Sequence, residues 1–494
     1  MDLAVLLSAL QLPQPAPGDA RPPALHRRLY QAIKGAITSG ALSGGLKLPA
    51  TRVLAQELKL SRNTVLLAYE QLAAEGYLVA TTQGSVVARL PRIASADDSR
   101  ASKATPGLSA RGLVVPMHWR TGSDILKAFT PGIPDIGKFP LPQWRALLDR
   151  AYRDINPRRL TFGETGGEPE LRSAVAAYVA AARGVHCDPE QVIVTQGAQG
   201  ALDLCARMLA DPGQVAWLEN PGYLGARVAM QTAGLQLHGI AVDAAGARPT
   251  EADWRDHPPR LIYLTPAHQY PMGPVLAAER RYDLLQRARA ANAWIIEDDY
   301  DSEFRYEGDP IPAMCSLLPS SPVIYVGTFS KTLLPVLRLG YAVVPHSVSR
   351  ALGNIGAQFT RPGHVAEQLA LARLIESGRY ARHLRTMRSL YAERRAALKL
   401  ALDRHLGGLV GVSGGAAGLH LTAVFQEAID DLAVHERARR AGLVVAPLSR
   451  YYLPGSRDPL RSGMLLGYGT VANQAIEGAV KQLAQLIDRE RRGL

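Results

Sequence analysis

The chain has 494 residues, more than one hydrophobic core usually serves, so we expect two or more domains. Its 56 lysines and arginines against 44 acidic residues give a net charge of +12, which permits an anionic partner without identifying one. The three cysteines are too widely spaced for a metal site or a redox pair, and an apolar span of about 20 residues is missing, so we expect a cytoplasmic protein with no membrane partner.

The first predicted domain covers residues 22–90 and is the more plausible polyanion surface, because ten basic residues stand against five acidic ones before residue 96. Apolar residues at helical spacing from Leu25 to Ile37 predict a first helix. A short second helix follows, which Thr51 is expected to cap, and Ser61 is expected to cap a third. The third helix exposes its N-terminal end, which is the end with which a recognition helix meets DNA.

A β-hairpin is predicted after the third helix. The apolar residues 77–79 and 86–87 flank a polar tip at 81–85, which is typical of a wing.

The string LPATRVLAQELKLSRNTVLLAYEQLAAEGYLVATTQGSVVA resembles the winged helix-turn-helix of the GntR class. At Leu66 this chain departs from members of the class that carry arginine. The resemblance implies that one set of residues contacts DNA, two of them from the wing tip in the minor groove: Arg52, Arg62, Asn63, Thr64, Gln83 and Gly84.

Residues 91–125 are polar, rich in serine and alanine and punctuated by proline, which predicts a flexible linker. Residues 126–494 form the second predicted domain. Seven apolar runs between QVIVT and LGYAVV alternate there with helical stretches. We therefore expect an α/β fold with a seven-stranded, mostly parallel sheet covered by helices on both faces. From about residue 379, long helices and short strands predict a small C-terminal α+β subdomain.

Three of the predicted strands end in chemically reactive sequences, where open parallel sheets place their sites. TQGAQG opens a helix whose N-terminus suits a phosphate. WIIEDD carries a buried strand into three carboxylates, for which a metal ion is the less favoured alternative. VIYVGTFSK leads to Lys331, whose apolar neighbours favour a lowered pKa and a nucleophilic amine over an ordinary surface lysine.

Together these segments resemble the fold-type-I aminotransferases, and SKTLLPVLRLGY matches their cofactor-lysine segment. The resemblance implies pyridoxal 5'-phosphate as cofactor, in a Schiff base with Lys331, and Asp298 as the partner of its pyridine nitrogen. Tyr300 would bind the ring's phenolic oxygen, and Tyr223 would stack on the ring. The phosphate would be held by the residues Ala198, Gln199, Thr328, Ser330 and Arg338.

The segment TPAHQYPMG departs from the aminotransferase pattern, because Tyr270 stands where many members carry asparagine. Either His268 or Gln269 would then contact the cofactor. The position expected for a carboxylate-binding arginine holds Met464 or Leu465, and two arginines elsewhere, 450 and 461, are open substitutes.

A GntR-type winged helix linked to a fold-type-I domain resembles the MocR-like transcriptional regulators. The resemblance implies a homodimer that binds operator DNA and senses pyridoxal phosphate, or an amine or amino-acid effector, through Lys331. The alternative is a pyridoxal-phosphate-dependent aminotransferase with an accessory DNA-binding module. A residual transaminase half-reaction is compatible with the first hypothesis.

Overall fold

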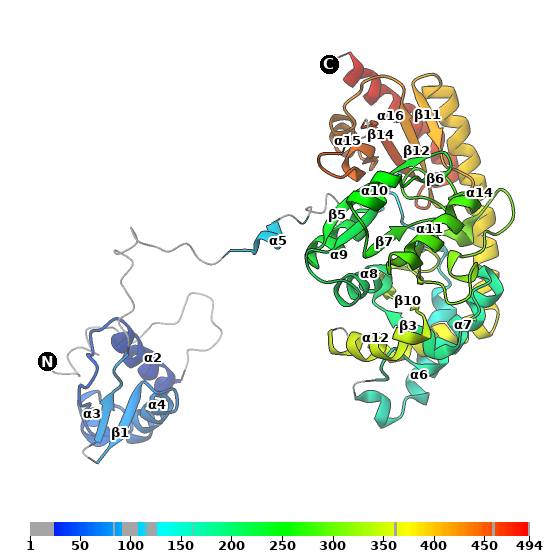
Figure 1. Cartoon of the computed structure of the whole chain (residues 1–494). Helices are drawn as coiled ribbons and strands as arrows, with labels where there is room; N and C mark the ends of the chain where they lie inside the picture. The colour runs from blue at the N-terminus through cyan, green and yellow to red at the C-terminus, as the bar shows by residue number, and fades with distance from the viewer. Residues whose placement is uncertain are drawn as a thin grey trace. The chain divides into compact units, whose positions relative to one another are not determined.

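The computed structural model describes residues 24–82, 84–90, 107–113, 115, 126–161, 163–359, 363–456 and 460–492. Contacts divide the chain into two compact units, Met1–Gly107 and Leu108–Leu494, which are described separately (Figure 1). Within the described ranges, no helix is long and apolar enough to cross a membrane.

The first unit is a three-helix domain with a β-hairpin. Its elements are α2 (Leu25–Thr38), α3 (Thr51–Glu57), α4 (Arg62–Ala74), β1 (Leu78–Thr81) and β2 (Gly84–Val87). The helices close around one apolar core in which Leu29, Leu54 and Leu72 are fully buried. The predicted winged helix is therefore confirmed as a fold.

Local details of this unit differ from the prediction. The Ser61 hydroxyl accepts a hydrogen bond from the Thr64 amide, so the predicted cap of α4 is correct. The predicted cap of α3 is wrong, because Thr51 is the first helical residue and Ala50 precedes it. The hairpin is longer than expected, since Thr81 pairs directly with Gly84. The expected tip at 81–85 is therefore too long, because its residues Thr81, Gly84 and Ser85 belong to the strands.

The second unit is built on an eight-stranded sheet in the order β3-β10-β9-β8-β7-β4-β5-β6. The strands are β3 (Val192–Thr195), β4 (Val215–Asn220), β5 (Gln236–Asp243), β6 (Gly246–Ala247), β7 (Leu261–Leu264), β8 (Trp294–Asp299), β9 (Val323–Thr328) and β10 (Gly340–Val343). The seven expected strands all occur. The eighth, β6, was missed because it is a two-residue return of β5 at the sheet edge. The sheet is mostly parallel, and β10 runs antiparallel to both of its neighbours.

Helices cover both faces of this sheet because its strands are apolar on both sides. Ile193 and Ile296 pack with α8 and α9, whereas Val194 and Ile295 face the opposite layer. The helices before the C-terminal part are α5 (Ala110–Leu113), α6 (Leu141–Asp154), α7 (Pro169–Arg183), α8 (Gly197–Met208), α9 (Leu224–Thr232), α10 (Glu251–Asp256), α11 (Ala278–Ala290), α12 (His346–Phe359) and α13 (Val365–Glu376).

The C-terminal part is a second layer of helices on a small antiparallel sheet of order β11-β12-β14-β13. Its elements are α14 (Arg379–Leu406), β11 (Val410–Ser413), β12 (His420–Phe425), α15 (Asp431–Arg440), β13 (Ala446–Pro447), β14 (Gly463–Gly467) and α16 (Ile476–Arg491). Short 3-10 turns occur in both parts of this unit, at Ile136–Lys138, Pro157–Leu160, Pro189–Gln191, Ser302–Phe304, Met314–Ser316, Pro335–Leu337, Leu448–Tyr451 and Asn473–Ala475.

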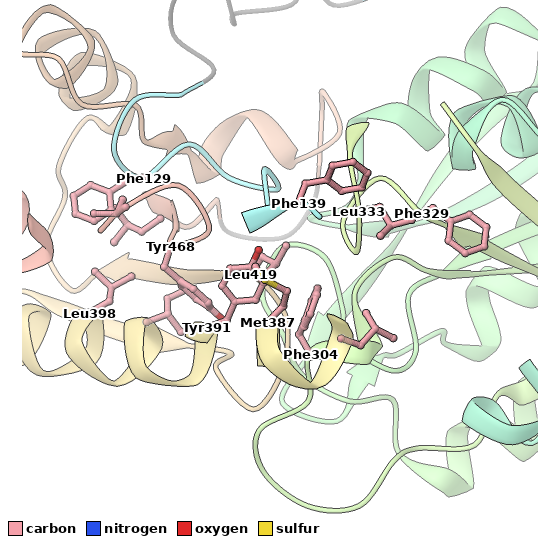
Figure 2. Packing of buried hydrophobic residues seen from close by; sticks show 14 of the residues in the cluster. Phe129, Phe139, Phe304, Phe329, Leu333, Met387, Tyr391, Leu398, Leu419 and Tyr468 are labelled. Atoms are coloured by element: carbon pink, nitrogen blue, oxygen red, sulfur yellow. The ribbon is translucent and has the colours of Figure 1, made fainter. Parts of the chain in front are cut away.

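One continuous apolar cluster ties the C-terminal part to the large sheet. Figure 2 shows it running from Leu398 and Tyr391 on α14 to Leu333 and Phe329, the neighbours of the predicted cofactor lysine. Phe129, from the start of the unit, joins the same cluster and bridges to the end of β14. The segment around Lys331 therefore rests on a packed core rather than in a surface loop.

Candidate functional site

The carboxyl ends of β7, β8 and β9 bring the predicted residues Asp298 and Lys331 together. Lys331 follows β9 by three residues and is half-buried. Its Nζ donates a hydrogen bond of 2.7 Å to the carbonyl of Gly132, which sequence analysis did not find. Gly132 has a φ of +72°, and a Cβ there would lie 2.9 Å from that Nζ. A glycine is thus needed for the lysine to occupy this position.

Asp298 is a buried carboxyl with one open oxygen. Its Oδ2 accepts a hydrogen bond of 2.8 Å from the Tyr263 hydroxyl, and its Oδ1 has no hydrogen-bond partner. Burial raises the pKa of Asp298 to about 7, which hydrogen bonding by Tyr263 and the positive charge of Lys331 partly oppose. A buried carboxylate with an unused acceptor suits a cationic N–H donor, and a protonated pyridine nitrogen is such a donor.

The two neighbouring carboxyls of β8 point to the opposite face of the sheet, as strand alternation requires. Asp299 lies 2.7 Å from the Arg183 guanidinium and accepts a hydrogen bond of 2.6 Å from Tyr325. Glu297 accepts backbone hydrogen bonds from residues 314 and 315. Among the described residues, no group of acidic, histidine or cysteine side chains is arranged to hold a metal ion. Asp298 is therefore the one carboxyl of the three that faces the site.

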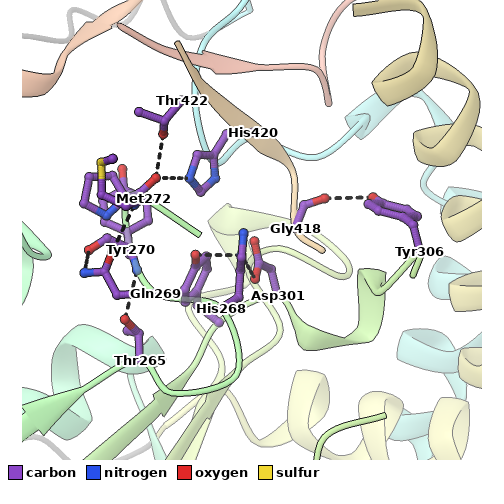
Figure 3. A network of polar contacts seen from close by, with 12 residues as sticks. Thr265, His268, Gln269, Tyr270, Met272, Asp301, Tyr306, Gly418, His420 and Thr422 are labelled. Carbon is purple, nitrogen blue, oxygen red and sulfur yellow. Dashed lines mark hydrogen bonds and ion pairs between the residues drawn. The ribbon is translucent and has the colours of Figure 1, made fainter. Parts of the chain in front are cut away.

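A buried histidine lies beside the site (Figure 3). His268 Nδ1 lies 2.9 Å from the Tyr300 hydroxyl and 3.0 Å from Asp301 Oδ1. Its Nε2 is buried and has no hydrogen-bond partner. Burial also raises the pKa of the Tyr300 phenol well above its ordinary value. The sequence pattern indicated His268 and Tyr300 but not Asp301, because a fourth acidic residue in one short run carries no signal of its own.

The amide of Gln269 is used to hold its own loop. Its Nε2 donates to the carbonyls of Pro221 and Tyr270, and its Oε1 accepts from the amide of Met272. Of the two alternatives for a cofactor contact, His268 is the residue with an unused ring nitrogen. Tyr270 contributes to an aromatic group with Tyr223, whose ring also stacks on that of Tyr263 at 6.5 Å between centroids.

The segments that carry the residues predicted to hold a phosphate approach one another at the N-terminus of α8. A Cβ at Gly340 would lie 2.7 Å from the Gly197 backbone, so β10 approaches the start of α8 directly. Arg338, two residues before Gly340, is exposed and has a φ of +51°. The helix N-terminus and this guanidinium together suit an anion.

The other members of this set are partly engaged within the protein. The Thr328 hydroxyl accepts a hydrogen bond from the Ser330 amide, and the Gln199 side chain donates to the carbonyl of Gly225. Ala198 lies in the first turn of α8 and offers its backbone.

The first unit brings two of the predicted DNA-contacting residues together, Arg52 and Arg62. Arg52 of α3 and Arg62 of α4 line the same depression, and Asn63 is exposed beside them. The Thr64 and Ser61 hydroxyls form a hydrogen bond of 2.8 Å. Gly84 begins β2 in the wing. The predicted contact Gln83 lies outside the described residues.

Neither of the two arginines considered for an effector carboxylate is buried. Arg450 and Arg461 are both exposed, and Leu465 is fully buried in an apolar cluster with Tyr451 and Tyr452.

Comparisons with known proteins agree with this two-part organisation. Residues 25–87 match the family of bacterial regulatory proteins of the gntR type, and residues 132–457 match the class I and II aminotransferases. An archaeal alanine:glyoxylate aminotransferase is 26% identical, with a TM-score of 0.71, and covers 78% of this chain and 98% of its own. A kynurenine aminotransferase of Pyrococcus horikoshii, solved with PMP, is 26% identical, with a TM-score of 0.69. The match covers 80% of this chain and 98% of that aminotransferase. The fold and site thus define a DNA-binding protein with a domain whose homologues depend on pyridoxal phosphate.

Relatives of nearly equal length share both parts. The probable rhizopine catabolism regulatory protein MocR of Rhizobium meliloti is 40% identical over 93% of each chain. The pyridoxine biosynthesis regulator PdxR of Corynebacterium glutamicum and the regulator TauR of Rhodobacter capsulatus are each 31% identical over 94% of this chain and 96% of their own. The chain belongs to the MocR-like family of helix-turn-helix transcriptional regulators.

We expect the Arg183–Asp299 pair to be essential for the stability of the second unit. Arg183→Met would leave Asp299 buried without its counterion, which costs about 3 to 5 kcal/mol. The measurement is the thermal unfolding midpoint of the purified protein. The control is Arg207→Met, which removes an exposed pair with Asp203 worth about 1 kcal/mol or less. Equal midpoints for the two variants would contradict the assignment.

Proposed function

We propose that Lys331 is the attachment point of pyridoxal phosphate in this regulator and that an effector acting there controls DNA binding. The observation that carries the proposal is the buried, half-satisfied carboxyl of Asp298 close to that lysine. Tyr300 and His268 would bind the ring's phenolic oxygen, and Tyr223 would cover the ring. When bound, the cofactor supplies an aldehyde that reacts with amines and a ring that withdraws electrons.

The phosphate would be held at the α8 N-terminus. There the backbone of residues 197–199, the hydroxyls of Thr328 and Ser330 and the guanidinium of Arg338 lie on converging segments. Each of these groups donates hydrogen bonds, and the helix end and Arg338 add positive charge.

The effector in our proposal is pyridoxal phosphate itself or an amine or amino acid, and the working form is a homodimer on operator DNA. An effector shifts the regulator only if it binds the two states of the dimer with different affinities. Residues 22–90 would contact the operator through Arg52, Arg62 and Asn63. Residues 91–125 would connect them to the cofactor domain, residues 126–494.

An aminotransferase with an accessory module is the second candidate, because the lysine, aspartate and tyrosine of a cofactor site are all present. The two candidates differ in turnover and in DNA binding. The purified protein with pyridoxal phosphate is incubated with amino donors and a keto acid, and its binding to DNA upstream of the flanking genes is measured by gel shift. We expect a sequence-specific shift without sustained turnover. Sustained turnover without specific DNA binding would overturn the regulatory proposal.

Replacing the lysine tests the cofactor site directly. Lys331→Ala should abolish the visible absorption band that pyridoxal phosphate gives when bound covalently to the wild-type protein, because the amine is lost. Circular dichroism should be unchanged. The exposed Lys399 of α14 provides the control, and Lys399→Ala should keep the band. A band that survives in Lys331→Ala would show that another amine holds the cofactor.

Replacing the first residue of the recognition helix tests the DNA surface. Arg62→Ala should weaken operator binding by at least about fivefold, since a base contact by arginine is worth about 1 to 3 kcal/mol. Affinity is measured at one fixed salt concentration, because phosphate contacts depend strongly on salt. Arg150→Ala, an exposed arginine of α6 in the other unit, is the control and should leave affinity unchanged. Equal affinities for the two variants would exclude Arg62 from the interface.

A further inference from the structure

The recognition helix α4 exposes a leucine in the middle of its polar surface. One face of the helix is buried through Val65, Ala68, Tyr69 and Leu72. Leu66, next to Val65 in the sequence, lies about 100° further round the helix, on the flank of the buried face, and is 39% exposed. The well-packed core beside it leaves this leucine in contact with solvent.

Helical spacing places Leu66 next to the residues expected to contact DNA. It follows Arg62 by four positions and Asn63 by three, so it lies one turn further along, between them around the helix. Arg62 in turn borders the depression that it shares with Arg52 of α3. The leucine is thus part of one continuous surface with the two guanidinium groups and the amide.

An exposed carboxylate marks the end of this surface. Glu70 lies one further turn along α4, on the same side as Leu66. A carboxylate is repelled by DNA phosphates, so the stretch of α4 that approaches DNA closely ends before Glu70. Within this stretch, Leu66 is the exposed apolar side chain on the Arg62 side of the helix.

We propose that Leu66 contacts the 5-methyl group of a thymine in the major groove and so specifies thymine at one position of each half-site. This inference rests on the proposed DNA-binding role of the N-terminal end of α4. The thymine methyl is the one apolar group that a base pair presents in the major groove, and an apolar side chain is its natural partner. A leucine has no donor or acceptor with which to read any other base.

The experiment removes the methyl group from the DNA and the leucine from the protein. The full-length protein with pyridoxal phosphate selects duplexes from a randomised double-stranded library. In the selected duplex each thymine is replaced in turn by deoxyuridine, which differs only by the missing methyl. Dissociation constants are measured by fluorescence anisotropy at one salt concentration for the wild type, Leu66→Ala and Leu400→Ala.

We expect one thymine in each half-site at which deoxyuridine weakens wild-type binding about fourfold, the factor for one buried methyl-sized group. The same replacement should have no effect on Leu66→Ala. The matched control is Leu400 of α14, an exposed leucine of the other unit. Leu400→Ala should keep the fourfold loss.

Two results would overturn the inference: a duplex in which no deoxyuridine weakens wild-type binding, or a loss that persists in Leu66→Ala. Failure of the wider DNA-binding proposal looks different. In that case the wild type selects no specific duplex, or Arg62→Ala binds the selected duplex as tightly as the wild type does.

Discussion

The second unit depends on how three consecutive buried carboxyls are accommodated at the end of β8. Residues 297, 298 and 299 are all buried, and an uncompensated charge there would cost several kcal/mol. Strand alternation sends the first and third to one face, where backbone amides satisfy Glu297 and the Arg183 guanidinium neutralises Asp299. Burial nevertheless raises the pKa of Glu297 to about 7. The scaffold thus stabilises two of the three carboxyls with its own groups.

The middle carboxyl is left incompletely satisfied, and the site is arranged around it. Asp298 has one hydrogen bond from Tyr263 and one open oxygen, and its pKa is raised to about 7 by burial. A carboxyl whose pKa is higher in the folded state than in the unfolded state opposes folding increasingly as the pH rises from about 4 to 7. A cation at the open oxygen would offset that cost. Asp298 destabilises the folded protein when no cofactor is bound. We therefore expect cofactor binding to stabilise the folded protein chiefly by removing the cost of this carboxyl.

The sequence alone was enough to predict site residues that are marked by a short local pattern. Asp298 lies at the end of an apolar strand, and Lys331 and Tyr300 follow such strands, so their positions at one edge of the sheet could be inferred from pattern and resemblance. Two contacts of the same site could not be inferred. The carbonyl that binds Lys331 belongs to Gly132, 199 residues away, and Arg183, the partner of Asp299, ends a distant helix. Such pairings depend on how the segments pack.

Three local features could not be predicted from the sequence either. Thr51 was expected to be a cap because threonine commonly is one, but the helix begins one residue earlier than that role requires. The strand β6 is too short to show any periodicity. The engagement of Gln269 with its own loop, which leaves the His268 ring nitrogen as the unused group, follows from a backbone path that no local pattern specifies.

The charge of this chain makes the recognition helix the decisive element for specificity. A net charge of +12 favours any DNA, because lysine and arginine contacts to phosphate add affinity without reading sequence. In the proposed docking, Arg52 and Arg62 would contribute to that general attraction as well as to base contacts. An uncharged residue on the same surface, such as the exposed Leu66, would add no charge-based attraction to phosphates. Any affinity that Leu66 contributes would be gained only at the matching base pair. It would therefore increase the ratio of specific to non-specific binding. A regulator that searches a genome depends on this ratio.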